Sequence, residues 1–393
     1  MITKKSIEDY DLKSKRVIIR VDFNVPVKEG VIEDDNRIQK SLKTIKYASD
    51  NKAKVILLSH MGRIKEEKDL QTNSLQVVAI RLSELLFKKV LFIDKCEGEE
   101  VEEAINNMED GDIILLENTR FEDLVGERES KNDSSLARYW ASLGDIFIDD
   151  AFAVAHRAHA SNYGIASYLP NGIGFLIKEE VECLSGVLEN PMHPNILVLG
   201  GAKVKDKIGV IDNLIDKVDY LIIGGAMANT FLKAKNVEVG KSIVDYEHLD
   251  YASNLLKKYS DKIILPIDVV VGDEHGNNAT LKKVGEVNPS DVIYDIGDAT
   301  SKLFNEYICK TKMAIVNGTM GMFEVDKYSI GTKNIFKSLL NTEKVIICGG
   351  DTASATLSLG YKDSYTLIST GGGASLEMLA GNEMPGIDVI DEK

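Results

Sequence analysis

The sequence has little of what marks secreted, membrane-spanning or metal-binding proteins. Its four cysteines, Cys96, Cys183, Cys309 and Cys348, lie far apart and form no CxxC or Cys/His metal spacing, which favours reduced thiols in a cytosol. The opening residues, MITKKSIEDYDLK, have no apolar core of a signal peptide, and no apolar run approaches the length of a membrane span. We therefore expect a cytoplasmic protein.

The sequence also has fewer basic than acidic residues. The chain has 47 lysines and arginines against 62 aspartates and glutamates, which gives a net charge of -15. Such a charge argues against general binding to nucleic acid or anionic membranes, so any anion site must be a local cluster of bases. Two phosphate-binding motifs are missing too. No GxGxxG occurs in a strand-to-helix turn, and Gly240-Lys241-Ser242 ends like a Walker A motif but has Lys235 where that motif needs glycine.

Length and hydrophobic patterning predict two α/β domains. The chain has 393 residues, which is more than a single hydrophobic core normally covers. Its 44% hydrophobic and 28% charged residues are typical of soluble globular proteins. Apolar strand-like runs alternate with amphipathic stretches such as 74–86 and 134–143, which predicts doubly wound, Rossmann-like parallel sheets. The runs are 17–21, 55–58, 90–93, 113–116 and 146–148 in the first half, and 196–199, 220–223, 263–265, 313–316, 345–348 and 365–368 in the second. The mostly helical segment 170–191, bounded by prolines, is the expected connector.

Basic residues gather after strand-like runs of the first half, where parallel sheets bind their ligands. Arginine forks suit phosphate and carboxylate oxygens, and Asp22 and Asn24 could take hydroxyl groups, so a small, polyanionic, hydroxylated ligand is expected. Any one arginine alone could form a surface salt bridge, and any one histidine a structural hydrogen bond. Their shared position at strand ends favours a site. The basic residues are Arg37, His60, Arg63, Arg120, His156, Arg157 and His159.

The second half carries its own anion signal in the stretch NILVLGGAKVKDKIGVIDNLI, residues 195–215. It predicts a buried strand, a glycine turn and a helix with Lys203 and Lys207 one turn apart at its positive pole. A phosphate at the helix start would compensate both lysines, but a solvated lysine face fits this segment equally well. Other strand ends read IGGAMAN, VNGTMGMFE, CGGDTAS and STGGGAS, and bare backbone there suits a flat ring and a phosphate chain.

Nine motifs, in order and spread over nearly the whole length, resemble phosphoglycerate kinase: RVDFNVP, SHMGR, LENTRF, DAFAVAHRAHAS, GGAKVKDKIGVIDNL, GGAMANTF, NGTMGMFE, GGDTASA and STGGGASLE. The resemblance implies reversible phosphoryl transfer from 1,3-bisphosphoglycerate to ADP, giving 3-phosphoglycerate and ATP, with Mg²⁺. It also implies a monomer whose two domains face each other across a cleft and close about a hinge. The expected parts are a phosphoglycerate domain (1–171), an interdomain helix (172–190), a nucleotide domain (191–375) and a C-terminal segment (376–393) that returns to the first domain.

The resemblance also implies particular site residues. Glu324 would take the ribose hydroxyls and Asp351 the magnesium of the nucleotide, although Glu324 could be an exposed loop acid and Asp351 the N-cap of a helix beginning at Thr352. The phosphoglycerate set is Asp22, Phe23, Asn24, Arg37, His60, Met61, Gly62, Arg63, Arg120 and Arg157. The nucleotide set is Lys203, Lys207, Gly297, Asn317, Glu324, Gly349, Gly350, Asp351 and Thr352.

The implied reaction moves a phosphoryl group between a carboxylate and a diphosphate, so no hydroxyl loses a proton and no general base is needed. The chain must align the reactants and offset the charge on the transferring group. We expect Arg37, Lys203, Lys207 and the amides of Gly372 and Gly373 to do so.

The sequence departs from the family at several positions, and none of these changes removes a charged ligand of either substrate. Proline is usual at Ile64, Asp298 and Thr319, tryptophan at Val316 and histidine at Leu367, and the segment EDLVGERES after LENTRF is longer than in most members. The departures are the only support for a non-catalytic nucleotide-binding protein of the same fold. The missing dinucleotide fingerprint argues against a dehydrogenase. The arginines and glycines at strand ends argue against a purely structural protein, because they contribute little to packing.

Overall fold

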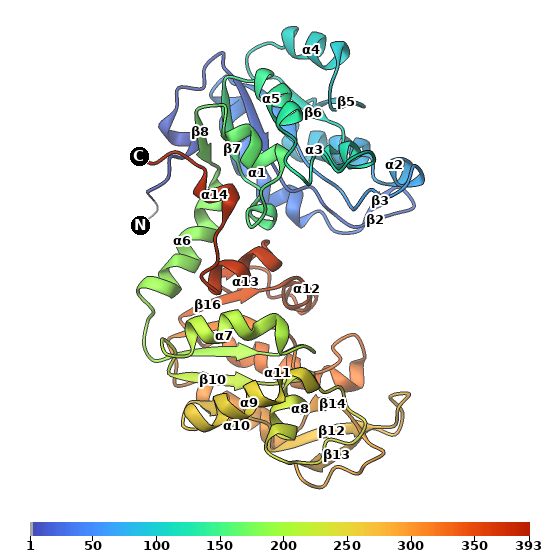
Figure 1. Cartoon of the computed structure of the whole chain (residues 1–393), viewed down its shortest axis with the longest axis vertical. Helices are drawn as coiled ribbons and strands as arrows, with labels where there is room; N and C mark the ends of the chain where they lie inside the picture. The colour runs from blue at the N-terminus through green and yellow to red at the C-terminus, as the bar shows by residue number, and fades with distance from the viewer. Residues whose placement is uncertain (1–2) are drawn as a thin grey trace. The chain divides into compact units, whose positions relative to one another are not determined.

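The computed structural model describes residues 3–393, which form two compact units (Figure 1). Unit 1 takes the described residues up to Glu182 and also Glu383–Lys393, so the end of the chain belongs to the N-terminal unit. Unit 2 is Cys183–Asn382, and the division falls inside the helix α6 (Phe175–Glu189). The domain boundaries expected near residues 171, 190 and 375 stay a prediction.

Unit 1 is built on a six-stranded parallel sheet with the strand order β5-β6-β4-β1-β7-β8. Its central strands are buried along almost their whole length, as in sheets covered on both faces. A short hairpin pairs β2 (Val27–Lys28) with β3 (Val31–Ile32). The sheet strands are β1 (Arg16–Arg20), β4 (Lys54–Leu58), β5 (Leu91–Ile93), β6 (Ile113–Leu116), β7 (Ile146–Asp149) and β8 (Asn171–Ile173), and the helices are α1 (Asn36–Asp50), α2 (Lys68–Thr72), α3 (Gln76–Leu86), α4 (Glu99–Asn106), α5 (Ser134–Ser142) and α14 (Pro385–Asp388).

The core of unit 1 fixes the start of α1, where a predicted site residue lies. Ile38 and Ile45 of α1 are seven residues apart, two helical turns, and both are fully buried in the same core cluster as Val17 and Val55 of the sheet. Arg37 directly precedes Ile38, so the burial of Ile38 fixes the position of Arg37 at the start of α1.

Unit 2 carries a second six-stranded parallel sheet, in the order β11-β10-β9-β15-β16-β17. The chain reverses its direction of winding between β9 and β15, which is the position where doubly wound sheets bind ligands. The strands are β9 (Asn195–Leu199), β10 (Tyr220–Ile223), β11 (Ile263–Ile264), β15 (Met313–Asn317), β16 (Lys344–Cys348) and β17 (Leu367–Ile368), and the helices are α7 (Ile208–Leu214), α8 (Gly225–Ala234), α9 (Leu249–Lys258), α10 (Asp298–Ile308), α11 (Ile330–Leu339), α12 (Gly350–Ser358) and α13 (Gly373–Leu379).

The fold class predicted from the sequence is confirmed, since each predicted strand-like run coincides with a strand of one of the two parallel sheets. The sequence did not predict a three-stranded antiparallel sheet in unit 2. It consists of β12 (Asp268–Gly272), β13 (Thr280–Lys283) and β14 (Val292–Ile296), with β12 in the centre, and stands at one end of the unit (Figure 1).

The helix predicted to carry Lys203 and Lys207 on one side was placed wrongly. The α-helix α7 begins only at Ile208, after a single 3₁₀ turn at Lys205–Lys207, and Lys203 lies in the preceding loop with its side chain exposed. The backbone N–H of Lys205 donates a 3.3 Å hydrogen bond to Asp245 Oδ2. That carboxylate therefore satisfies a free amide that the sequence analysis had left to a phosphate.

Candidate functional site

The basic residues of unit 1 gather at the carboxyl ends of β1, β4, β6 and β7, around an arginine that the sequence analysis missed. Arg20, the last residue of β1, is fully buried. Its Nε donates to Ser161 Oγ at 2.8 Å, and its Nη2 lies 3.2 Å from His60 Nδ1. Arg20 was missed because it lies inside the predicted strand-like run 17–21, whereas the other basic residues follow such runs.

Burial, and then repulsion from neighbouring arginines, lowers the pKa of several members of this cluster. Burial, followed by repulsion from Arg20 and Arg120, holds the pKa of His60 well below its usual range. Burial and the same two arginines lower the pKa of His159 to about 3. Both imidazoles are therefore neutral at physiological pH, and the positive charge of the cluster comes from its arginines.

Two loops of this cluster are joined by hydrogen bonds from predicted site residues. Arg37 Nη1 donates to Asp22 Oδ2, and Asp22 Oδ1 accepts the backbone N–H of Asn24 at 3.1 Å. Asn24 Oδ1 in turn accepts the backbone N–H of Gly62 at 2.9 Å. The loop after β1, the start of α1 and the loop after β4 are thus held as one surface. Phe23 and Met61 are buried beneath it, and Arg63 is exposed.

Arg120 has a donor that the protein does not satisfy. Its Nη1 donates to Ser130 Oγ at 3.2 Å and to Asp123 Oδ2 at 3.5 Å, but its Nε is buried without a hydrogen-bond partner. Burial, with repulsion from Arg120 and Arg63, also lowers the pKa of Arg157. A buried guanidinium donor without an acceptor is unfavourable, and an anion bound among these arginines would satisfy it.

A second residue missed by the sequence analysis is Glu129, which comes from the long segment after LENTRF. It is fully buried, and its Oε2 accepts the backbone N–H of Ser161 at 2.9 Å while its Oε1 accepts the Ser161 hydroxyl. Burial raises the pKa of Glu129, and the charge of Arg20 and the bonds from Ser161 oppose that rise. The longer segment therefore places a carboxylate behind the arginine cluster.

In unit 2 the backbones of β9 and β15 approach each other closely at their carboxyl ends. Gly200 N–H donates to Asn317 O at 2.9 Å, and Gly201 N–H donates to Thr319 O at 3.1 Å. A Cβ atom at Gly200 would lie 2.1 Å from Thr319 O, so only glycine fits there. This glycine pair leaves bare backbone at the sheet's switch point, as the sequence predicted.

Lys207 and Asn317 meet beside this switch point, and Lys203 is exposed in the loop before α7. Lys207 Nζ donates to Asn317 Oδ1, and Asn317 Nδ2 donates to Cys348 O at 2.7 Å. Burial lowers the pKa of Lys207, and the charge of Asp206 opposes that shift. A half-buried ammonium held by a neutral amide remains available to a phosphate group.

The helix starts after β16 and β17 carry several more of the predicted residues. The helix α12 begins at Gly350, so Asp351 lies in its first turn and is not its N-cap, and the alternative start at Thr352 is wrong. Thr352 Oγ1 accepts the backbone N–H of Gly318 at 2.7 Å, which ties this turn to the loop after β15. The helix α13 begins at Gly373 with Gly372 as its N-cap.

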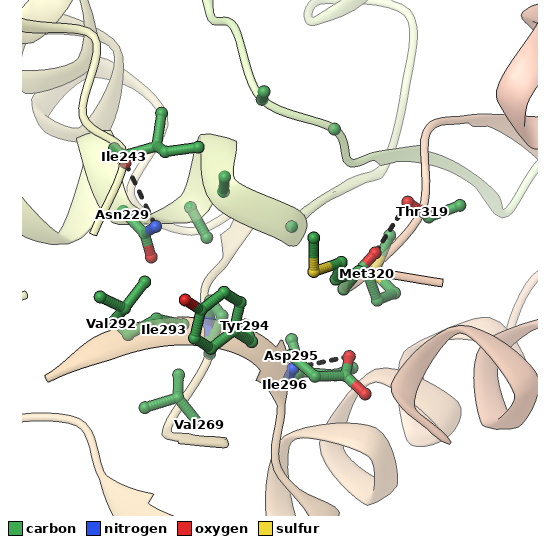
Figure 2. A pocket seen from close by; sticks show the side chains of 18 of the residues that line it. Asn229, Ile243, Val269, Val292, Ile293, Tyr294, Asp295, Ile296, Thr319 and Met320 are labelled. Atoms are coloured by element: carbon green, nitrogen blue, oxygen red, sulfur yellow. Dashed lines mark hydrogen bonds between the residues drawn. The ribbon is translucent and has the colours of Figure 1, made fainter. Parts of the chain in front are cut away.

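A cavity of about 300 Å³ opens beside this switch point, and Figure 2 shows the side chains around it. Most of its lining is apolar, with side chains from α8, β12, β14 and the loop after β15. Asp351 is the one predicted nucleotide residue among its lining residues, which also include Gly201, Asn229, Ile243, Val269, Val292, Tyr294, Asp295, Ile296, Thr319 and Met320. The sequence analysis quoted Asn229 within the motif IGGAMAN after β10 but gave it no role, and it missed Tyr294, which lies in β14 outside the main sheet.

The other predicted nucleotide residues do not line this cavity. Gly297 is the N-cap of α10, and a Cβ atom there would lie 2.3 Å from the Asp268 carboxyl group. Gly349 is similarly close to Asn317, since a Cβ atom would lie 2.4 Å from Nδ2. Glu324 is an exposed residue of the loop after β15.

The fold is that of an α/β protein with a cluster of arginines in one unit and a largely apolar cavity in the other. The family described as Phosphoglycerate kinase matches residues 7–382. Phosphoglycerate kinases of Fusobacterium nucleatum and Enterococcus faecalis are 51% and 49% identical over 397 residues, with at least 99% of this chain and 100% of each relative covered. The chain therefore belongs to the phosphoglycerate kinase family, and it is a glycolytic kinase.

Solved structures agree with this assignment. Phosphoglycerate kinase from Coxiella burnetii is similar with a TM-score of 0.87 and 40% sequence identity, and that from Pyrococcus horikoshii OT3 with 0.86 and 31%, each covering 98% of both chains. None of these relatives favours the non-catalytic or dehydrogenase alternatives. Among residues 3–393, no helix has the length and apolar character that crossing a membrane requires.

Proposed function

We propose that this kinase binds phosphoglycerate at the arginine cluster of unit 1 and the adenine nucleotide at the cavity of unit 2. The observation that supports the first assignment most directly is the buried, unpartnered Nε of Arg120 within a cluster of arginines and neutral histidines. Arginine forks would take the phosphate and carboxylate, and Asn24 and Asp22 would orient the hydroxyl group. The proposed set keeps all ten phosphoglycerate residues expected from the sequence.

The proposed transfer is a direct in-line displacement between the acyl phosphate and the β-phosphate of ADP. No proton is abstracted, so the neutral state of His60 and His159 does not hinder the reaction. Arg37 from unit 1, with Lys203 and Lys207 from unit 2, would offset the charge of the transferring group. The free amides at Gly372 and Gly373 would add donors. Because each unit carries one ligand, we also propose that ligand binding brings the two units together and excludes water.

Magnesium fits the residues of unit 2 in one way only. Among residues 3–393, no group of three or more histidine, cysteine or acidic side chains could hold a metal ion. A magnesium ion bound mainly through nucleotide phosphates and water needs one or two carboxylates, and Asp351 is exposed and lines the cavity. We assign it that role. The ion would offset the negative charge of the nucleotide phosphates.

A coupled assay of ATP consumption with 3-phosphoglycerate and Mg²⁺ tests the proposed function. We expect turnover in the unaltered protein and a loss of roughly a hundredfold or more in Lys203→Ala, because a preorganised charge on the transferring group is removed. Lys205→Ala is the matched control, since Lys205 is an exposed lysine two residues away. Absence of turnover in the unaltered protein, or equal losses in both variants, would contradict the proposal. We also propose that the protein is a monomer and that it is cytoplasmic. Analytical ultracentrifugation tests the monomeric state.

A further inference from the structure

The guanidinium of Arg120 is held by the protein at one of its corners. Its Nη1 donates to Ser130 Oγ at 3.2 Å and to Asp123 Oδ2 at 3.5 Å, and the side chains of Arg120 and Asp123 are both largely buried. A guanidinium has a second bidentate edge, formed by Nε and Nη2, on the side away from Nη1. The contacts of Nη1 therefore fix the direction in which this second edge faces.

Asp123 determines how the Ser130 hydroxyl meets Arg120. Ser130 Oγ donates to Asp123 Oδ2 at 2.5 Å, and the Ser130 backbone N–H donates to Asp123 Oδ1 at 2.8 Å. Both carboxylate oxygens are thus turned toward Ser130. Because a hydroxyl has one proton, and Asp123 receives it, the Ser130 oxygen presents only lone pairs to Arg120 Nη1. A carboxylate suits this role, since it accepts at both oxygens while an amide accepts at only one.

The segment that carries Ser130 is itself fixed in place. The backbone N–H of Arg128 donates to Glu122 O at 3.2 Å, and Arg128 Nη1 donates to Glu122 Oε2 at 2.6 Å, so the chain closes on itself. Glu129, which directly precedes Ser130, is fully buried, and its carbonyl oxygen accepts the backbone N–H of Ala160 at 3.0 Å. The long segment after LENTRF therefore returns to the arginine of that motif with an acceptor at a fixed place.

We propose that Asp123, acting through Ser130, positions the Arg120 guanidinium to bind phosphoglycerate. The inference rests on the proposed assignment of phosphoglycerate to the arginine cluster. Fixing a long side chain before the ligand arrives removes part of the ordering cost of binding. Charge alone acts in the opposite direction, because a carboxylate beside an anion site repels the anion. A positioning role and a purely electrostatic one therefore predict opposite changes in affinity when Asp123 is neutralised.

Calorimetry of 3-phosphoglycerate and ADP binding to the full chain tests this role. We expect Ser130→Ala, which removes an acceptor of Nη1 and keeps every charge, to weaken the binding of 3-phosphoglycerate roughly fivefold. Asp123→Asn should weaken it by a similar factor, roughly fivefold, and neither variant should change the affinity for ADP. Ser130→Thr restores the hydroxyl and should bring the affinity to within about twofold of the unaltered protein. Because Asp123 acts through Ser130, the double variant should lose much less than the product of the two single losses.

Asp133→Asn is the matched control, because it makes the same chemical change in the same segment. The Asp133 carboxylate accepts the backbone N–H groups of Ser135 and Leu136 at the start of α5, and asparagine caps a helix about as well. Its affinity for 3-phosphoglycerate should equal that of the unaltered protein. Unchanged or tighter binding in Ser130→Ala or Asp123→Asn, an equal loss in the control, or a parallel loss of ADP affinity would overturn the role. Each of the two variants decides alone, so the test stands if one of them does not fold.

Arg120→Ala separates this outcome from failure of the proposed function. Removing the guanidinium should weaken the binding of 3-phosphoglycerate by roughly tenfold or more, since charge-assisted hydrogen bonds are lost. If Arg120→Ala binds 3-phosphoglycerate as tightly as the unaltered protein, the assignment of phosphoglycerate to the arginine cluster fails. If Arg120→Ala weakens the binding while Ser130→Ala and Asp123→Asn do not, only the positioning role is refuted.

Discussion

Asp150 Oδ1 accepts the backbone N–H of Leu176 at 2.8 Å, in the first turn of α6. The same oxygen accepts Ile177 N–H at 3.3 Å, and Thr44 Oγ1 of α1 accepts Phe175 N–H at 3.0 Å. Three free amides at the start of α6 are thus capped by side chains of unit 1, both fully buried. The helix in which the two units meet along the chain is therefore anchored to the helix that carries Arg37.

This cap predicts a pH-dependent stability. Burial raises the pKa of Asp150 to about 8, against the hydrogen bonds from Thr44, Ile177 and Leu176 and with the help of neighbouring Asp149. The folded protein then holds a proton that the unfolded chain releases near pH 4, so the group's contribution to stability is full below pH 4 and is lost as the pH rises to 8. The free energy of unfolding should therefore fall between pH 5 and pH 8. We expect Asp150→Asn to make this fall smaller by as much as about 1.4 kcal/mol per pH unit, measured by urea unfolding.

Asp149 and Asp295 contribute to the same slope, because burial raises their pKa values to about 6 and about 7. Asp150→Asn should therefore flatten the dependence without abolishing it. Asp50→Asn, at an exposed position at the end of α1, is the matched control and should keep the slope of the unaltered protein. An unchanged slope in Asp150→Asn would show that the carboxyl group is ionised throughout this range.

The sequence predicted the two parallel sheets well because their strands are buried on both faces and read as continuous apolar runs. It did not predict the sheet of β12, β13 and β14, where β13, Thr280–Lys283, is mostly exposed and reads TLKK. Exposed, charged strands resemble loops in a single sequence. This reason does not apply to β12 (DVVVG) or to β14 (VIYDI), which forms a wall of the cavity: both are largely apolar runs that the sequence analysis left out.

Side chains near the sites were predictable only where they follow a strand. Arg20 and Glu129 were missed since one ends a strand and the other stands in a long polar segment, and their importance comes from burial that no local pattern reveals. The start of α7 was placed too early because Asp245, 40 residues further on, takes an amide at the preceding turn. In each case a tertiary contact overrides the local sequence signal.

Glu129 should be needed for the stability of unit 1. Its charge, with those of Asp149 and Asp22, offsets Arg20, and the Ser161 hydroxyl joins the two side chains, so removing this carboxylate leaves the buried arginine less compensated. We expect Glu129→Gln, which keeps the size of the side chain, to cost about 3 kcal/mol in the free energy of unfolding by denaturant. Glu127→Gln is the control, because Glu127 is exposed and pairs only with Lys131 at the surface. Equal stability of the two variants would contradict the pairing.

Arg37 should act on turnover and not on nucleotide binding, because it belongs to unit 1 and the nucleotide is assigned to unit 2. We expect Arg37→Ala to lower kcat by roughly a hundredfold or more, as for other preorganised charges, with unchanged affinity for ADP by calorimetry. Arg81→Ala provides a matched control, since Arg81 pairs with Asp35 and Glu84 away from the strand ends. If kcat is nearly unchanged, or if ADP affinity falls in parallel, Arg37 does not have the proposed role.

Gly200 is the position where a single methyl group should separate the two strands of the switch point. A Cβ atom there would lie 2.1 Å from Thr319 O, which is backbone and cannot turn aside as a side chain can. We expect Gly200→Ala to cost about 2 kcal/mol or more in stability by overpacking, and to weaken ADP binding because Thr319 lines the cavity. In the control Gly186→Ala, within α6, the nearest atom is Lys344 Nζ at 3.4 Å, so this variant should be as stable as the unaltered protein or about 0.5–1 kcal/mol more stable. Thermal unfolding and calorimetry on both variants decide the matter: if Gly200→Ala matches Gly186→Ala in both measurements, the close approach of β9 and β15 is not what shapes the nucleotide site.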